Sequence, residues 1–171
     1  MVGSVTEMRT RRYSWDDPLP NAAAIGRRSG LELLLALRRG DLPTPPIMQT
    51  LGIERIEPGE GHITITMTPR EYHYSLLGTV HGGVIATLLD SAAGCAVHTA
   101  LPAGMGYVSL DLTTKFLRPV TVASGELRCH GSVINRGRTT ALAEARILDA
   151  RDRLVAHATS SCLLFEVPDA G

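Results

Sequence analysis

The sequence predicts an α+β fold, with one long helix packed on one face of an antiparallel sheet of about six strands. Two observations predict this class. The run from Gly82 to Val97 has the length of a helix and is apolar on nearly every side, which is typical of a buried helix. The other segments alternate apolar and polar residues and are joined by short turns, which favours antiparallel strands. Small residues along the helix let a curved sheet wrap around it.

The elements expected before the sheet are an extension, a helix and a connector. Residues 1–28 mix charged residues with Pro, Asn and Gly, which predicts a flexible N-terminal extension. Residues 29–40 predict an accessory helix, because a capping box opens this segment and a glycine ends it. Three prolines within residues 43–46 predict a stiff connector. We expect residues 29–171 to form a single domain with its core in 51–165.

The strands and the central helix follow the connector. The central helix is expected over Gly82–Ala100, because a proline and a glycine come directly after it. Along one expected strand, Val108 alternates with Ser109 and Asp111, and we interpret Asp111 as structural. The expected strands are Leu51–Ile56, His62–Thr68, Tyr107–Phe116, Gly125–Ile134, Thr139–Leu148 and Leu154–Phe165.

Composition and charge argue against several classes of protein. The formal net charge is zero, so nothing in the bulk sequence attracts nucleic acid or a membrane surface. The three cysteines are too scattered for a disulfide framework or a zinc finger. Cys95 and His98 supply only two metal ligands, so we predict no metal site. Without an apolar leader or a membrane-spanning run, the chain is expected to be cytoplasmic.

Asp90 is the single ionisable acid between Gly82 and Val97. A buried carboxylate without a partner is costly, so it must be neutralised, hydrogen-bonded or used chemically, and burial is expected to raise its pKa. Of the residues three and four positions away, only Thr87 can donate a hydrogen bond to it. Because the others are small, a ligand or another segment can come close. This pattern favours an enzyme.

Four motifs together resemble those of the hotdog-fold acyl-CoA thioesterases, and most closely the phenylacetate-pathway (PaaI-like) group. In order, they read Gly78-Thr-Val-His81-Gly-Gly, Leu88-Leu-Asp90, Tyr107-Val-Ser-Leu-Asp111 and Phe116-Leu-Arg-Pro119. The resemblance implies a hotdog fold over residues 51–165 and hydrolysis of an acyl- or aryl-acyl-CoA to free acid and CoA. It implies no metal ion or redox cofactor, since coenzyme A enters as part of the substrate.

The resemblance also implies roles for particular residues. Asp90 would activate water as a general base or attack directly as a nucleophile. The N–H of Gly82, at a helix N-terminus beside Gly83, would polarise the thioester carbonyl, and unpaired N–H groups there do stabilise developing negative charge. Ser109 would help to hold the attacking water. The family commonly has Asn six residues before the histidine, where this chain has Ser75, whose hydroxyl can still donate one hydrogen bond.

The remaining candidate residues are expected to bind or support the substrate. His81 is interpreted as support for the loop and the helix start rather than as a catalytic base, because no acid is spaced to orient its ring. Coenzyme A carries phosphates, which favour Arg and Lys. N–H groups of the turn at Gly137 can also bind a phosphate. The basic candidates are Lys115, Arg118, Arg136 and Arg138.

The spacing of Gly82 and Asp90 predicts a site shared between two chains. Eight residues of helix separate them by about 12 Å. One carbonyl group cannot meet the Gly82 N–H while its carbon lies about 3–3.5 Å from water held by Asp90 of the same chain. Two antiparallel helices in a two-fold dimer would solve this problem and create two identical sites. We therefore expect a homodimer, or a homotetramer built from dimers, and the family's interface-shared site agrees.

Two other functions are considered on the same fold. One is a non-catalytic acyl-CoA-binding regulatory module, because a fold does not fix a function. The acid at Asp90 favours the enzyme, whereas Ser75 in place of Asn keeps the binding module open. The other is a dehydratase, which needs a different placement of histidine and acid from the one in this sequence.

Overall fold

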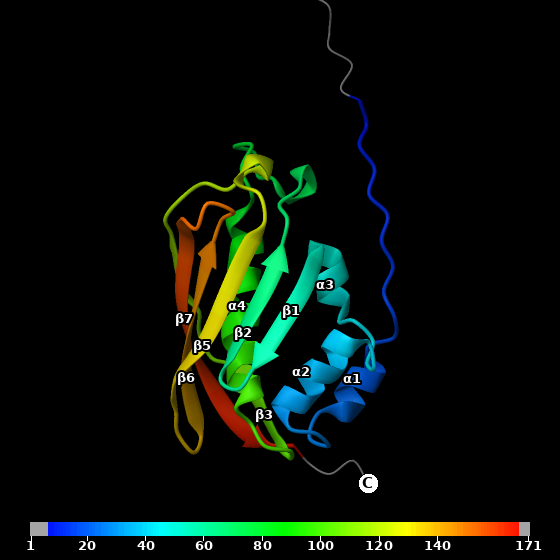
Figure 1. The fold of residues 1–171 in the computed structure, drawn as a ribbon, viewed down its shortest axis with the longest axis vertical. Helices are drawn as coiled ribbons and strands as arrows, with labels where there is room; N and C mark the ends of the chain where they lie inside the picture. Colours follow the sequence, from blue (N-terminus) through cyan, green and yellow to red (C-terminus); the bar gives the residue numbers. More distant parts are fainter. Residues whose placement is uncertain (1–6, 168–171) are drawn as a thin grey trace, which may run out of the picture.

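The computed structural model describes residues 7–167, which form four α-helices, two short 3₁₀ helices and seven strands (Figure 1). The helices are α1 (Leu19–Ala24), α2 (Gly30–Arg39), α3 (Pro46–Leu51) and α4 (Gly82–Thr99), with η1 (Glu71–His73) and η2 (Val122–Ser124). The strands are β1 (Ile53–Gly59), β2 (His62–Met67), β3 (Met105–Ser109), β4 (Thr113–Phe116), β5 (Leu127–Arg136), β6 (Thr140–Leu148) and β7 (Leu154–Glu166).

One antiparallel sheet contains all seven strands. Its order is β1-β2-β5-β6-β7-β3, and β4 also pairs with β7. The sheet curves around α4, and α2 and α3 lie beside β1 at one edge of the sheet (Figure 1). The α+β class and the helix packed on one face are therefore confirmed. No helix within residues 7–167 has the length and apolar character needed to cross a bilayer.

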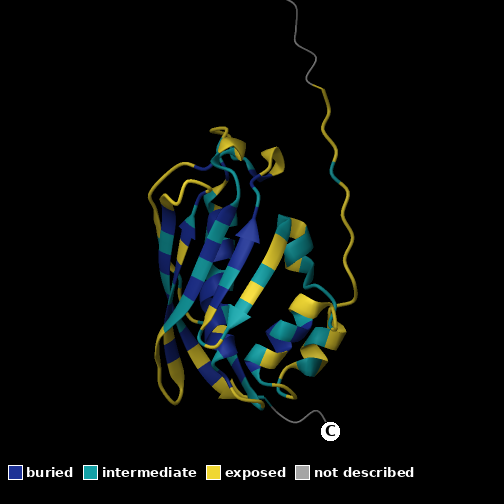
Figure 2. Ribbon diagram, in the orientation of Figure 1, coloured by how far each residue is buried: buried dark blue, intermediate teal, exposed yellow. Residues whose placement is uncertain are grey.

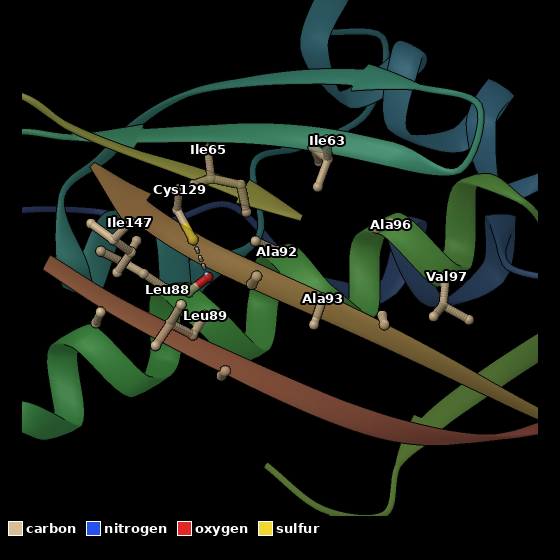
Figure 3. Close-up of a cluster of buried hydrophobic side chains, with 14 of the residues drawn as sticks. Ile63, Ile65, Leu88, Leu89, Ala92, Ala93, Ala96, Val97, Cys129 and Ile147 are labelled. Atoms are coloured by element: carbon tan, nitrogen blue, oxygen red, sulfur yellow. Dashed lines mark hydrogen bonds between the residues drawn. The ribbon is translucent and has the colours of Figure 1, made fainter. Parts of the chain in front are cut away.

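The core lies between α4 and the inner face of the sheet. Ten of the residues of α4 are buried, and small side chains such as Ala92, Ala93 and Ala96 are fully enclosed. Figure 3 shows Ile63 and Ile65 of β2 lying opposite the helix. Every second residue of the long strands is buried, whereas the outer face is partly or fully exposed (Figure 2). The small side chains thus allow the close approach that the sequence predicted.

The segment expected to be one strand over Tyr107–Phe116 is divided into β3 and β4, which lie end to end along β7. The pairing register shifts by one residue at the division, because Ser109 faces Cys162 but Thr113 faces Thr159. Asp111 holds this bulge. Its carboxylate accepts the Ser161 N–H at 3.0 Å, and its carbonyl accepts the hydroxyl of Ser160 at 2.7 Å. A bulge of this kind re-aims the side chains that follow it.

Two short helices lie where the sequence predicted an extension and a connector. α1 falls inside residues 1–28, and α3 begins at Pro46 in the expected connector. Both elements have a proline at or next to the first helical position, where its missing N–H costs little. Gly52 ends α3 in the left-handed conformation with φ 68°, so β1 starts two residues later than expected. The flexibility of residues 1–28 remains a prediction.

At Gly131, β5 lies directly against the backbone of α4. A Cβ added there would overlap the carbonyl group of Ala92 in the helix backbone. Backbone cannot turn away as a flexible side chain does, so we expect Gly131→Ala to lower the free energy of unfolding by about 1–3 kcal/mol. Urea unfolding measures this change against Ser132→Ala, which alters the neighbouring outer-face residue. Equal midpoints for the two variants would show that the helix can move away freely.

Candidate functional site

The N-terminus of α4 presents one unused backbone donor. His81 is the N-cap residue, and its Nδ1 accepts the Gly83 N–H at 2.9 Å. The next two amides, of Val84 and Ile85, donate to the His81 carbonyl. The N–H of Gly82 meets no acceptor in the described part of the chain. Of the two candidate glycine amides, Gly82 is therefore the one free to bind an incoming oxygen.

An apolar cavity of about 320 Å³ adjoins Gly82. The ring of Phe116 covers the glycine, since a Cβ added at Gly82 would lie 3.3 Å from its Cζ. Ile85 and Arg118 also line the cavity, together with Thr79, Val80, Leu117, Pro119, Val120 and Val155. The sequence did not predict this role for Phe116. On an uninterrupted strand it would share the face of Val108, and the bulge at Asp111 places its ring against Gly82 although the side chain stays 58% exposed.

Asp90 and Ser109 form a second polar group on the exposed side of α4. The Ser109 hydroxyl donates to Asp90 Oδ1 at 3.1 Å, and both side chains are half-buried. The donor expected from helix spacing, Thr87, instead donates to the Gly83 carbonyl at 2.8 Å. Ser109 points to α4 because the polar face of β3 is turned inward, whereas Val108 is 48% exposed. Both residues line a cavity of about 320 Å³.

The two thiols and the phenol whose pKa values the Asp90 charge raises stay protonated at neutral pH. Burial and then the Asp90 charge raise the pKa of the Cys95 thiol to about 11. Burial also raises the pKa of Tyr107 well above its usual value, with a smaller contribution from Cys95. Burial raises the pKa of Cys162 as well. Neither a thiolate nor a phenolate is therefore supplied beside Asp90, which argues against a cysteine nucleophile here.

Ser75 lies in the loop that leads to α4. Its hydroxyl accepts the Leu77 N–H at 3.3 Å, and its own N–H donates to the Thr79 carbonyl. Ser75 and His81 line a third cavity, of about 510 Å³. Leu76 and Leu77 at the loop tip are 106% and 87% exposed. The structure thus brings Ser75, His81 and Gly82 to the same end of α4.

The basic candidates divide between the two ends of α4. Arg118 lines the cavity at Gly82, and Lys115 is exposed on β4 opposite His157. Arg136 instead donates to the Ala100 carbonyl at the C-terminal end of the helix, and Arg138 follows it in the β5–β6 turn. The Gly137 N–H in that turn donates to the Thr140 carbonyl at 2.8 Å. This amide is therefore already hydrogen-bonded and is not free to bind a phosphate.

His98 gives the fold a pH dependence. Its side chain is 8% exposed, and its Nδ1 has no partner within residues 7–167. Burial lowers its pKa below the ordinary 6.5, and burial also lowers the pKa values of His73 and His130. The folded state therefore binds these protons less well than the unfolded chain. Their contribution to stability is complete above about pH 6.5 and is lost as the pH falls below it.

We therefore expect the thermal midpoint to fall between pH 7.5 and pH 5.5, a range above the ordinary pKa values of Asp and Glu. Scanning calorimetry at several pH values measures this slope. The variant His98→Phe keeps a ring of similar size without the titrating group, so its slope is expected to be smaller. A midpoint that does not change with pH over this range would contradict the role given to the buried histidines.

The structure thus forms two half-sites within one chain. The first contains Gly82, His81 and Ser75 at the start of α4, and the second contains Asp90 and Ser109 two turns further along. They line separate cavities. Eight residues of helix separate Gly82 from Asp90 by about 12 Å, which is too far for one carbonyl group to meet both.

Comparisons with known proteins agree with this architecture. A family model described as the thioesterase superfamily matches residues 77–156. A Halobacterium salinarum protein named "Putative esterase" is 32% identical over 121 residues, covering 66% of this chain and 76% of that protein. Acyl-coenzyme A thioesterase 13 of Mus musculus is 32% identical over 77 residues, covering 45% of this chain and 54% of the mouse protein.

A solved structure shows the same fold. The PaaI protein of E. coli, from the phenylacetic acid degradation operon, superposes with a TM-score of 0.64 and 24% identity. The match covers 73% of this chain and 86% of PaaI. The hotdog fold that the sequence motifs imply is confirmed by this likeness.

Proposed function

The chain belongs to the thioesterase superfamily and is a thioester hydrolase, and on that premise we propose that it hydrolyses an acyl- or aryl-acyl-CoA to the free acid and CoA. The observation that carries the proposal is the Asp90–Ser109 pair, a half-buried carboxylate held by a hydroxyl donor in a cavity on an otherwise apolar helix. Such a carboxylate is placed to act on water or on a bound carbonyl carbon.

The reaction follows from the two half-sites. The thioester carbonyl oxygen binds the Gly82 N–H, which stabilises the negative charge that develops on it. In the general-base route, Asp90 takes a proton from water, the water oxygen attacks the carbonyl carbon, and the C–S bond breaks. In the nucleophilic route, Asp90 attacks that carbon, the C–S bond breaks to leave an anhydride between the acyl group and Asp90, and water then hydrolyses the anhydride. In both routes the departing CoA thiolate takes up a proton. Ser109 keeps Asp90 in position, and no metal ion or redox cofactor takes part in these reaction steps.

The two half-sites are proposed to come from different subunits of a homodimer. β3 ends the sheet, and its outer edge has no strand partner within residues 7–167. Beside this edge, α4 leaves Gly83, Thr87 and Asp90 partly or fully exposed. Open strand edges favour pairing with a second chain. Two α4 helices packed antiparallel would then place Asp90 opposite Gly82 of the partner subunit, and a tetramer would contain two such pairs.

The cavities favour a compact acyl group and a phosphate-bearing carrier. The apolar cavity at Gly82 lies near the lower limit of about 300 Å³ for ligand pockets. It is proposed to receive the part of the substrate next to the carbonyl carbon. Arg118 at the same cavity, and Lys115 near it, are proposed to bind CoA phosphates. Arg136 and Arg138 lie at the other end of α4. They could therefore bind CoA phosphates only at a site formed with the partner subunit.

Release of free thiol from a panel of acyl-CoA thioesters tests this proposal. The panel contains short, medium and long aliphatic acyl groups and phenylacetyl-CoA, and a thiol-reactive dye reports the CoA formed. Turnover of at least one of them that is abolished in the Asp90→Asn variant supports the proposal. Binding of acyl-CoA without thiol release from any member would overturn it.

A further inference from the structure

The N-terminal segment, which lies outside the region shared with the family model, is bound to the rest of the chain through Arg11. Its guanidinium donates to the carbonyls of Thr50 and Gln49, at 2.7 and 2.6 Å. These carbonyls belong to the last turn of α3. The same guanidinium lies 4.0 Å from the centre of the Tyr72 ring. Arg9, two residues earlier, pairs with Glu71. The segment therefore joins α3 to η1.

A buried histidine makes a second connection between α3 and η1. His73 is 4% exposed, and its Nε2 lies 2.8 Å from the Leu51 carbonyl, which can only accept. Nε2 must therefore carry the proton, and Nδ1 accepts the Arg70 N–H at 3.0 Å. The ring also packs edge-on against Tyr72, with 4.3 Å between ring centres. His73 is fully hydrogen-bonded as a neutral ring, so its function is to fix η1 in place.

The connection continues from η1 to the start of α4. The His73 carbonyl accepts the His81 N–H at 2.8 Å. His81 in turn caps α4 through the Gly83 N–H, which leaves the Gly82 N–H free for the substrate. Two hydrogen bonds therefore link His73, the neighbour of the Tyr72 ring on which Arg11 lies, with the Gly83 amide next to Gly82. In Figure 1 the N-terminal segment runs along α3 toward the same end of the molecule.

We propose that Arg11 is a positioning residue, which holds η1 against α3 and so fixes His81 and the Gly82 N–H for catalysis. The proposal rests on the proposed function, because it assigns Arg11 a part in aligning the same site. The planar fork of Arg reaches two carbonyls while its face lies on an aromatic ring, and Lys cannot make both contacts. Small misplacements of a catalytic group far from the mutation can cost up to about 100-fold in rate.

The variants Arg11→Ala and Arg12→Ala test the proposal as a matched pair. Arg12 is the exposed neighbour, and no hydrogen bond or ion pair of its side chain is found within residues 7–167. We expect Arg11→Ala to lower kcat about tenfold with KM changed less than about twofold, because alignment rather than binding is lost. We expect Arg12→Ala to keep the parental rate. Arg11→Lys is expected to fall below the parental rate, because Lys cannot make both of the Arg11 contacts.

Hydrogen exchange gives a readout that does not depend on turnover. In Arg11→Ala, the peptide covering residues 71–84 is expected to exchange about tenfold faster, whereas peptides from β6 and β7 keep the parental rate. Equal behaviour of the Arg11 and Arg12 variants in both measurements would overturn the inference, as would faster exchange spread over the whole sheet. A parental enzyme that releases no thiol would refute the proposed function instead, and the exchange result would still decide the positioning role.

Discussion

Asp90→Asn is expected to fold normally and to lose at least about 100-fold in thioester turnover. Asparagine has nearly the shape of aspartate and can still accept the Ser109 hydroxyl through its side-chain oxygen. It cannot take a proton from water or attack a carbonyl carbon as a carboxylate does. Removal of a general base typically costs 100- to 10,000-fold, so the loss appears in kcat (roughly two orders of magnitude or more). Thiol release at saturating acyl-CoA measures it.

The matched control for this variant is Ser109→Ala. It removes the donor that holds Asp90 Oδ1 but leaves the carboxylate, so a smaller loss is expected, about tenfold. Circular dichroism and the oligomeric state should match those of the parent for both variants. Hydrolysis by Asp90→Asn at the parental rate would remove Asp90 from the mechanism. An equal loss in both variants would make Ser109 as important as the acid and require a direct contact with water or substrate.

The sequence predicted the central helix and its acid because both depend on local patterns. The apolar run beginning at Gly82 is too long for a strand and therefore predicts a buried helix. A single acid such as Asp90 within a buried helix is costly whatever the helix packs against, so it marks a functional residue. His81 and the following glycines likewise define a helix start from residue type alone. The strands were found from their alternation, with ends displaced by up to three residues and with one expected strand divided into β3 and β4.

The sequence could not predict which face of β3 points inward. Apolar alternation placed Val108 on the expected core face, but Val108 is 48% exposed and Ser109 faces α4. On an edge strand next to a proposed subunit interface, the usual rule is reversed, because an exposed apolar face can be covered by another chain. The bulge at Asp111 then changes the register again and turns Phe116 toward Gly82. Neither event leaves a periodic signal.

The contacts of the N-terminal segment also escaped sequence analysis. Arg11 lies within residues of mixed composition, which predict a flexible extension. Its partners are two carbonyls of a short helix and an aromatic ring more than thirty positions away. Local propensity carries no information about such long-range pairs, and only the fold brings them together. A proline at the start of α3 and Gly52 at its end were the signals that could have located that helix.

A mixture of two inactive chains is expected to recover activity if Gly82 and Asp90 act across subunits. The two chains are Gly82→Pro, which lacks the proposed N–H, and Asp90→Asn. The structure favours normal folding of the proline variant, because proline is accepted at the first helical position and His81 is already extended, with ψ 138°. A Cβ at this position comes within 3.3 Å of the Phe116 ring, a contact that a small ring movement relieves.

Each heterodimer contains one site with both substitutions and one with neither. In the intact site, Gly82 of the Asp90→Asn chain faces Asp90 of the Gly82→Pro chain. Heterodimers isolated through two different affinity tags should therefore show about half the parental kcat per dimer, whereas either homodimer stays inactive. A chain carrying both substitutions, paired with the parent, provides the reciprocal control and should be inactive, because each of its two shared sites then contains one substitution. Verified heterodimers without activity would place both half-sites in one chain, and the 12 Å between them would then require α4 itself to change shape on binding substrate.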